Sequence, residues 1–309
     1  MIATVTLNPS LDEWIELSAW RLGALHRAES FQRYPGGKGI NVSRVIHELG
    51  GRTMAFALAG GADGLILRRL LEEMHIPHHF TPVAGTTRNN YKIRTRQPRA
   101  LTEVNTPGPA VSPSALQRLY RQLLRGRRPD GVVLSGSLPP GAAPTVYARW
   151  IRDLTRRGIP AALDSSGPAL RHGLAAKPWL VKPNREEAEE LLGRRLSSEN
   201  QMARAIRQLL RRGPKAAIIS LGRDGALLGS AEGIWRAKPP AVTVNSAVGA
   251  GDSLVAGVVY GWTKGQPLVE AFRLGIACGA ATAMTPGTEL CHRDDVRRLL
   301  PKVGLRRVG

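Results

Sequence analysis

The sequence predicts an α/β protein in which helices cover both faces of a mostly parallel central sheet. Two observations carry this prediction: short apolar runs alternate with helical stretches along the chain, and loops rich in glycine and polar residues follow the runs. Several runs are continuously apolar, which is typical of strands buried on both faces. Ligands of such sheets bind at the carboxyl ends of the strands, so a functional site is expected in the loops there.

The expected strands are spread over most of the chain. They are IATVTL (2–7), GVVLSG (131–136), PAALDSS (160–166), WLVKPN (179–184), AAIISLG (216–222) and AVTVNS (241–246). A glycine-rich turn, GGKGI (36–40), leads into the first expected helix. The loops after the strands include SLPPG, SSG, REEAEEL and RDG, so polar and glycine residues gather at one edge of the sheet.

Two segments, at about 12–35 and 87–106, interrupt this rhythm. Both alternate apolar and polar residues, which indicates antiparallel strands. We expect the two segments to pair into a small sheet that stands off the main one. The sequence shows no internal repeat and no low-complexity linker.

Hydropathy and cysteine usage indicate a cytoplasmic enzyme without a membrane partner. No apolar run approaches the length of a membrane span, and the N-terminus MIATVTLNPSLDEW lacks the layout of a signal peptide. The two cysteines, Cys278 and Cys291, have no C-x-x-C spacing and no nearby histidine cluster. We therefore expect two buried thiols and neither a disulfide framework nor a zinc site.

The formal net charge of +20 makes nucleic-acid binding a hypothesis from a different functional class. The arginines cluster in RLYRQLLRGRRPD, ARWIRDLTRRG and ARAIRQLLRRG, where they stand at helical spacing beside leucine, isoleucine and tryptophan. This pattern is typical of the solvated faces of amphipathic helices. Aromatic residues are not interleaved with the arginines and no docking element is evident, so we expect no specific nucleic-acid partner.

Two glycine-rich segments precede helices and suit an anionic ligand. In VGAGD the acidic Asp252 directly follows Gly249, Ala250 and Gly251, at a place where a helix offers unpaired N–H groups and the positive end of its dipole. Taken alone, Asp252 is more simply explained as a helix cap. In YPGGKGIN the side chains of Lys38 and Asn41 could meet the oxygens of a polar ligand.

Neither segment fits a common nucleotide-binding template. A Walker A loop would need glycine in place of Gln32 and a hydroxyl residue in place of Gly39. A dinucleotide fingerprint would need glycine in place of Leu254. The two segments belong instead to a longer series of motifs.

That series resembles the ribokinase-like (PfkB-type) sugar kinase family, which includes 1-phosphofructokinase, tagatose-6-phosphate kinase and the minor 6-phosphofructokinase. Nine motifs occur in the family's order: LNPSLD, GGKGINVSRV, TEVNTPGP, LSGSLPPG, LDSSG, LVKPNREEAEEL, SLGRDGALL, VGAGDSLVAG and PGTELC. The resemblance implies one three-layer ribokinase-like kinase domain over 1–309, with a β-sheet lid. It also implies ATP as phosphoryl donor and a phosphorylated sugar as acceptor.

For the donor side, the resemblance makes Asp252 the base that takes the acceptor's proton, with the N–H groups of the preceding three residues as the anion hole for the phosphoryl group. Asn184 and Glu187 match the N-x-x-E pattern that orders Mg²⁺ through water, although a solvated helix start explains these residues taken alone. The residues implied for ATP are Ser220, Gly222 and Gly225 at the phosphates and ribose, and Ala277, Ala281 and Thr285 beside the adenine. Helix packing is the alternative for the last three.

For the acceptor side, the resemblance implies one wall of sugar ligands and one phosphate site. The wall consists of Asp12, Gly37, Lys38 and Asn41, and the phosphate is assigned to Arg88, with Ser135 and Ser137 facing the same cleft. A guanidinium suits a phosphate dianion, and a nearby ammonium adds charge. A buried cation pair without an anion would be costly, so we expect the cleft to demand a phosphorylated sugar.

The identity of the sugar phosphate is less constrained. Lysine at position 38 and glutamate at 103 favour conversion of fructose 1-phosphate to fructose 1,6-bisphosphate, with 6-phosphofructokinase and tagatose-6-phosphate kinase as alternatives. His26 stands where similar family members carry asparagine. The resemblance further implies a homodimer formed through the lids, and it leaves room for a monovalent cation as a second cofactor.

Overall fold

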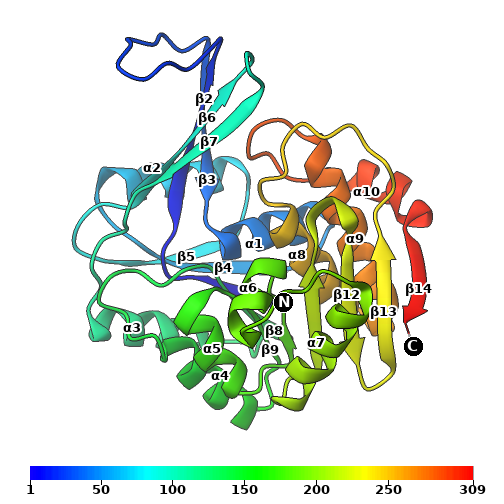
Figure 1. The fold of residues 1–309 in the computed structure, drawn as a ribbon. Coiled ribbons are helices and arrows are strands. Elements are labelled where there is room, and N and C mark those ends of the chain that lie inside the picture. Colours follow the sequence, from blue (N-terminus) through cyan, green and yellow to red (C-terminus); the bar gives the residue numbers. More distant parts are fainter. Residues whose placement is uncertain (309) are drawn as a thin grey trace.

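The centre of the molecule is a ten-stranded sheet, and the structure, a computed structural model, describes residues 1–308. The strand order is β14-β13-β12-β11-β10-β9-β8-β1-β4-β5 (Figure 1). The seven strands from β11 to β5 are parallel, whereas β12, β13 and β14 extend one side as antiparallel strands. The bounds are β1 Ile2–Thr6, β4 Thr53–Ala59, β5 His78–Pro82, β8 Gly131–Ser135, β9 Ala161–Asp164, β10 Leu180–Val181, β11 Ala216–Ser220, β12 Ala226–Ser230, β13 Gly233–Lys238 and β14 Gly304–Val308.

Helices cover both faces of this sheet, because successive side chains of a strand point to opposite sides. Val5 and Leu134 lie in one apolar core, with α3 to α7, and Ile2 and Val133 lie in a second core, with α1 and α8 to α10. The predicted three-layer α/β fold is confirmed. The helices are α1 Lys38–Glu48, α2 Gly61–Glu73, α3 Pro113–Leu123, α4 Val146–Arg156, α5 Gly167–Ala175, α6 Arg185–Leu192, α7 Glu199–Arg211, α8 Ala250–Thr263, α9 Leu268–Met284 and α10 Arg293–Leu299, with short 3-10 turns at Gly222–Asp224 and Leu300–Lys302.

The arginine-rich segments form the amphipathic helices that the sequence predicts. In α3, Leu116 and Leu119 are buried while Arg118 and Arg121 are exposed, and α4 and α7 show the same division. These arginines therefore lie on the outer face of the helical layer, where water solvates them.

One expected strand is wrong. AVTVNS (241–246) is a loop, although five of the six expected strands appear as β1, β8, β9, β10 and β11. The backbone N–H groups of Asn245 and Ser246 donate to the carbonyl of Ala283 on α9 rather than to a neighbouring strand. Local alternation cannot reveal that no strand partner is available.

A separate four-stranded sheet, the lid, projects from the main body (Figure 1). Its order is β3-β2-β6-β7, with bounds β2 Ser10–Leu17, β3 Ser30–Gly36, β6 Arg88–Thr95 and β7 Ala100–Asn105. The pairs β2–β3 and β6–β7 are antiparallel, but β2 and β6 are parallel, which corrects the expectation of antiparallel strands throughout. The reason is that β2 follows β1 and β6 follows β5, so both leave the same edge of the parallel sheet in one direction.

Two further features of the described residues agree with the sequence. Cys278 and Cys291 are both free and buried. Among residues 1–308, no helix is both long enough and apolar enough to cross a bilayer.

Candidate active site

Asp252 lies in the first turn of α8 at the centre of the site. Gly249, which precedes the helix, has a φ of 80°, a left-handed conformation that glycine adopts without strain. The Asp252 side chain is buried, and its Oδ2 accepts a hydrogen bond from Nδ2 of Asn41, 2.8 Å away on α1. This carboxylate is thus held by another helix, so capping of its own helix does not explain the residue.

Asn41 is itself oriented by a buried cation. Its Oδ1 accepts a hydrogen bond from Nη1 of Arg44 at 3.3 Å, and the same Nη1 donates to the carbonyl of Pro35 at 3.2 Å. Burial lowers the pKa of Arg44 to about 10, so the guanidinium stays charged at neutral pH. Because a cation holds the carbonyl end of the amide, its NH₂ end faces Asp252.

Two lysines and a second aspartate complete a buried charge cluster. Nζ of Lys38 lies 3.2 Å from Oδ2 of Asp164 and 3.7 Å from Oδ1 of Asp252, and Nζ of Lys182 lies 3.2 Å from Oδ1 of Asp164. Asp164 and Lys182 stand within the motifs LDSSG and LVKPNREEAEEL, but the motif resemblance assigns a role to neither residue. The available signal was a charged residue at the end of an apolar strand, in AALD and WLVK.

The charges in this cluster shift one another's pKa values. Burial raises the pKa of Asp252, and the positive charge of Lys38 only partly opposes it. For Asp164 burial acts in the same direction, but Lys182 and Lys38 outweigh it and hold the pKa below its ordinary value. Burial alone would lower the pKa of Lys38, yet Asp164 and Asp252 raise it, so the ammonium stays charged.

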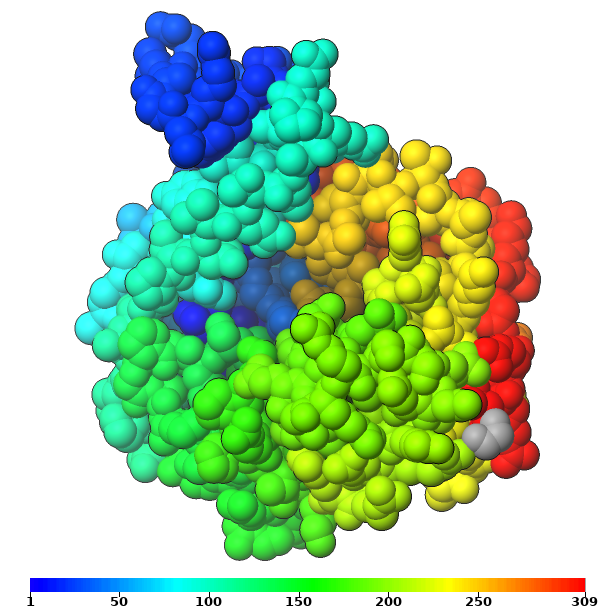
Figure 2. Space-filling model, viewed as in Figure 1, coloured from blue at the N-terminus to red at the C-terminus, as the bar shows by residue number. Residues whose placement is uncertain are grey.

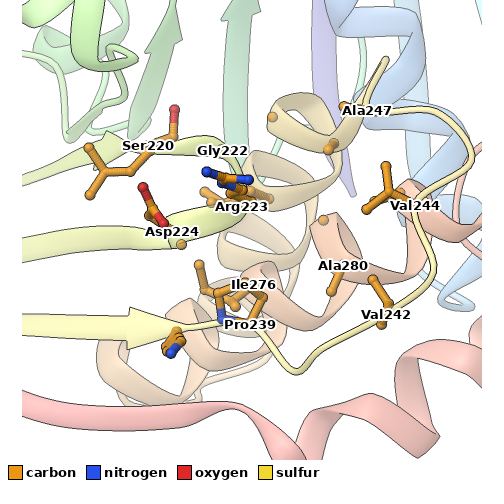
Figure 3. A pocket seen from close by; sticks show the side chains of 18 of the residues that line it. Ser220, Gly222, Arg223, Asp224, Pro239, Val242, Val244, Ala247, Ile276 and Ala280 are labelled. Carbon is orange, nitrogen blue, oxygen red and sulfur yellow. The ribbon is translucent and has the colours of Figure 1, made fainter. Parts of the chain in front are cut away.

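A cavity of about 860 Å³ opens beside the start of α8. Figure 3 shows Ser220, Gly222 and Arg223 on one side of it and Ile276 and Ala280 of α9 on another. Loop 239–247 closes a further side, and Ala250 and Gly251 bring the helix N-terminus to the cavity wall. The volume is that of a typical small-molecule site.

The residues expected to bind ATP divide into two groups. Ser220, Gly222 and Gly225 line the cavity. The stretch around Ala277, Ala281 and Thr285, which is expected beside the adenine, reaches the cavity through neighbouring residues: Ala277 and Ala281 themselves are fully buried in the core, and the buried Thr285 donates its hydroxyl to the carbonyls of Thr282 and Glu289. The cavity is lined instead by Ile276, Gly279, Ala280 and Ala283. These residues share one face of α9, whereas Ala277 and Ala281 project from another face.

Asn184 and Glu187 form a capping box at the start of α6. Oδ1 of Asn184 accepts from the backbone N–H of Glu187 at 2.7 Å, and Oε2 of Glu187 accepts from the backbone N–H of Asn184 at 2.8 Å. One oxygen of each side chain is therefore engaged in the cap, and the other Glu187 oxygen is left over. Within residues 1–308 no cluster of three or more His, Cys, Asp or Glu could enclose a metal, so these residues fit only a cation held mainly by water and ligand oxygens.

On the lid side, Asp12 of β2 belongs to a hydrogen-bonded group at the foot of the lid. It is buried, and its Oδ1 accepts from Oγ of Ser10 at 2.9 Å and from Nδ2 of Asn90 at 3.2 Å. Gly37, whose φ is 112°, turns the chain from β3 into α1 and thereby sets Lys38 and Asn41 on the first turn of that helix.

Arg88 lies at the start of β6, close enough to Asp12 for their charges to interact. Its Nη1 donates to the carbonyl of Thr106 at 3.4 Å, while its buried Nε has no partner. Burial lowers the pKa of Arg88, and the charge of Asp12 opposes this. Arg88 is thus an expected acceptor residue with at least one buried donor, Nε, that is not hydrogen-bonded.

Ser137 is exposed and accepts a hydrogen bond from Nδ2 of Asn8 at 3.2 Å, at the rim of a second cavity of about 530 Å³. Ser135 is fully buried and contacts the carbonyl of Asp164 at 3.4 Å, so the expectation that it faces the cleft is wrong. Ser135 and Ser137 differ because Ser135 ends β8 inside the sheet.

Glu103 of β7 has a partner that the sequence did not indicate. Its Oε2 accepts from Nζ of Lys92, 3.0 Å away on β6, and the Lys92 side chain is buried. The negative charge of Glu103 is therefore already compensated within the lid.

Figure 2 shows a hollow between the lid in blue and cyan, the green segments below it and the yellow segments beside it. Segments from the N-terminal part of the chain form its floor. The larger cavity opens at the start of α8, and the charge cluster lies beside the same helix start at the carboxyl ends of β9 and β10, at the edge of the sheet where the sequence predicts the site.

Comparison with known proteins supports this assignment. The model of the pfkB family carbohydrate kinases matches residues 5–295. The 1-phosphofructokinase of Bacillus subtilis is 36% identical over 308 residues, which is all of both chains, and the ATP-dependent 6-phosphofructokinase isozyme 2 of Mycobacterium tuberculosis is 36% identical over 96% of this chain and 88% of its own. A crystal structure of phosphofructokinase-2 from Escherichia coli, with substrates and products, matches with a TM-score of 0.93 at 34% identity, covering 97% of this chain and 98% of that one. The predicted resemblance is confirmed, and this chain belongs to the pfkB family of carbohydrate kinases.

Proposed function

We propose that this kinase transfers the γ-phosphoryl group of ATP to a hydroxyl of a ketohexose phosphate, and that fructose 1-phosphate is the preferred acceptor. The observation that carries the proposal is the Asp252 carboxylate, held by Asn41 and Lys38 at the junction of a nucleotide-sized cavity and the lid-covered cleft. A base in this position would lie between the phosphoryl donor in the cavity and the phosphoryl acceptor under the lid.

In this reaction the acceptor oxygen attacks the γ-phosphorus, ADP leaves, and Asp252 takes the hydroxyl proton. The raised pKa of Asp252 favours proton uptake, while Asn41 keeps one carboxylate oxygen oriented. The N–H groups of Gly249 and Gly251 stabilise the charge on the phosphoryl oxygens at the positive end of α8. The N–H of Ala250, which donates to the carbonyl of Ala247 at 3.3 Å, would join them by exchanging that bond for the phosphoryl oxygen.

ATP would occupy the larger cavity, with Ser220, Gly222 and Gly225 beside its phosphates and ribose. Magnesium would supply charge neutralisation at the phosphates when bound. Asn184 and Glu187 would hold its water shell from the start of α6, since their capping box leaves one glutamate oxygen over.

The acceptor phosphate is assigned to Arg88, whose buried Nε has no partner. Lys38 is not a second unpaired cation, because Asp164 and Asp252 already balance its charge. Lys38 instead contributes beside the reacting groups, and Asp12 and Asn41 with the Gly37 turn hold the sugar hydroxyls.

The acceptor is best tested with a panel of sugar phosphates in a coupled assay of ADP release. We expect the highest kcat/KM with fructose 1-phosphate, in line with the Bacillus subtilis relative, and lower values with fructose 6-phosphate and tagatose 6-phosphate. A preference for fructose 6-phosphate would favour the activity named for the Mycobacterium tuberculosis relative. Efficient turnover of free fructose, ribose or adenosine would refute the phosphosugar assignment.

A homodimer formed through the lids is part of the proposal. Seven of the ten large apolar side chains exposed within residues 1–308 belong to the lid: Trp20, Leu22, Leu25, Phe31, Tyr91, Leu101 and Val104. A second lid would remove this surface from water. Sedimentation analysis should show a dimer that Leu25→Asp weakens. A monomeric wild type would refute it.

A monovalent cation is a further proposed cofactor, since the Escherichia coli enzyme has been crystallised in complex with potassium. Turnover is expected to rise when KCl replaces tetramethylammonium chloride at constant ionic strength, and equal rates in the two salts would contradict this.

A further inference from the structure

Asp164 carries a buried carboxylate that none of the roles above explains. Its side chain has no exposed surface, and its oxygens lie 3.2 Å and 3.3 Å from Nζ of Lys38 and 3.2 Å from Nζ of Lys182. The Lys182 side chain is 3% exposed and that of Lys38 is 39% exposed. A carboxylate in such surroundings is stabilised by these two ammonium groups and requires both of them.

The fold brings the three residues together from distant parts of the chain. Asp164 ends β9 and Lys182 directly follows the adjacent strand β10, where its backbone N–H donates to the carbonyl of Leu163 at 3.0 Å. Lys38 is the first residue of α1. Parallel pairing fixes the relation of Asp164 to Lys182, so the carboxylate is a rigid anchor that the more exposed Lys38 can contact.

The two anchored lysines flank the start of α8. Nζ of Lys38 is 3.7 Å from Oδ1 of Asp252, and a Cβ placed on Gly251 would lie 3.8 Å from Nζ of Lys182. An ammonium group has three donors, so each lysine has further donors to offer beyond its contact with Asp164. We propose that Asp164 is a positioning residue, which holds the ammonium groups of Lys38 and Lys182 beside Asp252 and the start of α8 without touching either substrate. This inference rests on the proposed function.

The alternative hypothesis is that the ion cluster only stabilises the fold. The two hypotheses differ in what they predict when the charge of Asp164 is removed. The charged groups facing Asp252 are Lys38, Asp164 and Lys182, and those facing Lys38 are Asp164, Asp252 and Glu187. The negative charge of Asp164 adds to burial in raising the pKa of Asp252, and it also raises the pKa of Lys38. Removing that charge lowers the pKa of Asp252, which moves the acid limb of a pH–rate profile toward lower pH, whereas Lys38 keeps its proton throughout the accessible range.

The test is the variant Asp164→Asn, with kcat measured across pH in the ADP-release assay. We expect kcat to fall about 10²-fold, because a small misplacement of catalytic groups costs about that factor in rate, and the acid limb to move down by about one pH unit. The KM for ATP should change little. An unmoved acid limb, with or without a lower kcat, would overturn the proposal, because a purely structural cluster changes the amount of folded enzyme but not the pH at which that limb lies.

Asp153→Asn provides the matched control. Asp153 of α4 also pairs with two cations, Arg156 and Arg157, at 3.0 Å and 2.8 Å, but it lies on the outer helical layer. The same chemical change there should leave the acid limb in place. If the control moved this limb as far as Asp164→Asn does, the assignment to Asp164 would fail.

A readout without turnover separates this proposal from the proposed function. The ¹³C shift of the Asp252 carboxyl, assigned by its loss in Asp252→Asn, should titrate at lower pH in Asp164→Asn than in the wild type. An unchanged titration would overturn the Asp164 proposal even if no sugar phosphate were turned over, whereas a shifted titration with an inactive wild type would count only against the proposed function.

If Asp164→Asn does not fold, the double variant Asp164→Asn/Lys182→Gln is used in its place, because it keeps the net charge of the cluster unchanged. Because Lys38 would still lose its anchor, we expect a kcat about ten-fold below that of Lys182→Gln alone. Equal kcat values for the double and single variants would overturn the proposal.

Discussion

At the scale of single residues, the site combines an ionised carboxylate with very little water. Asp252 is 6% exposed, and only Asn41 and the nearby lysines compensate its charge. Burying this charge costs free energy, and uptake of a proton removes that cost. The same burial therefore makes the carboxylate an effective base.

The first prediction concerns the role of Asp252 as a base. Asp252→Asn preserves the size of the side chain but removes the proton acceptor, so turnover should fall roughly 10²- to 10⁴-fold. Calorimetric titration should show ATP affinity close to that of the wild type. Asp294→Asn, at an exposed surface position, is the control. Near wild-type turnover in the Asp252 variant would remove the residue from the mechanism.

The same carboxylate should lower stability at neutral pH. Burial raises its pKa above the ordinary 3.8, so between these values the folded chain binds more protons than the unfolded chain and stability falls as pH rises. Asp252→Asn removes this cost. Urea unfolding should show the variant to be more stable than the wild type at pH 7, with a difference that shrinks toward pH 4. A variant less stable at pH 7 would contradict the sign.

A third prediction concerns Arg88 and the acceptor phosphate. Arg88→Ala removes a charge-assisted contact worth about 1.5 to 3 kcal/mol, so the KM for the sugar phosphate should rise by roughly one to two powers of ten. The KM for ATP should hardly change. Arg118→Ala makes the same substitution on the exposed face of α3 and should leave both constants as they are. If only the KM for ATP rose, Arg88 would not be the residue that binds the phosphate of the acceptor.

At the scale of elements, the close packing of α8 against α9 fixes where the catalytic turn lies. A Cβ on Gly257 would stand 2.6 Å from the Cα of Gly275, so the two backbones meet with no room for a side chain. Because α8 carries Asp252 at its start and α9 lines the larger cavity, this contact fixes the position of Asp252 relative to the cavity wall.

Gly257→Ala should therefore destabilise the protein, although alanine is the better helix former. The overlap involves backbone that cannot move aside, and we expect a loss of about 1 to 3 kcal/mol in urea unfolding. Gly304→Ala is the control, because its nearest neighbour would lie 3.9 Å away and its φ is not positive. An unchanged or higher stability of Gly257→Ala would show that the helices separate easily.

At the scale of the whole molecule, the net charge of +20 comes mainly from arginines, which are exposed on the outer helices, in the loops and on the lid. These side chains are spread over helix faces and form no reading element for a nucleic acid. Their summed field attracts anions in general, including the anionic substrates of a kinase.

We therefore predict that any affinity for DNA or RNA is weak, indifferent to sequence and steeply reduced by salt. Fluorescence anisotropy with two unrelated duplexes and one single strand, between about 50 and 200 mM salt, measures this directly. Tight and sequence-selective binding at physiological salt would assign the basic surface a function that the kinase activity does not require.

The sequence by itself determined the fold class and the position of the site. The alternation of apolar runs with helical stretches is a local pattern, and parallel strands place their carboxyl ends at one edge whatever the remaining details are. The motifs added the family, and with it residues such as Asp252, Asn41 and Lys38, which the structure brings within a few ångströms.

What only the tertiary structure decided depends on contacts between segments far apart in the chain. The face of α9 that lines the cavity excludes Ala277 and Thr285, and the strand expected at 241–246 has no partner. The pairing of Asp164 with Lys38 and Lys182 depends on strand order and helix placement. The physical reason is that local patterns fix which elements form, whereas packing and strand register, set by long-range burial, fix which side chains meet.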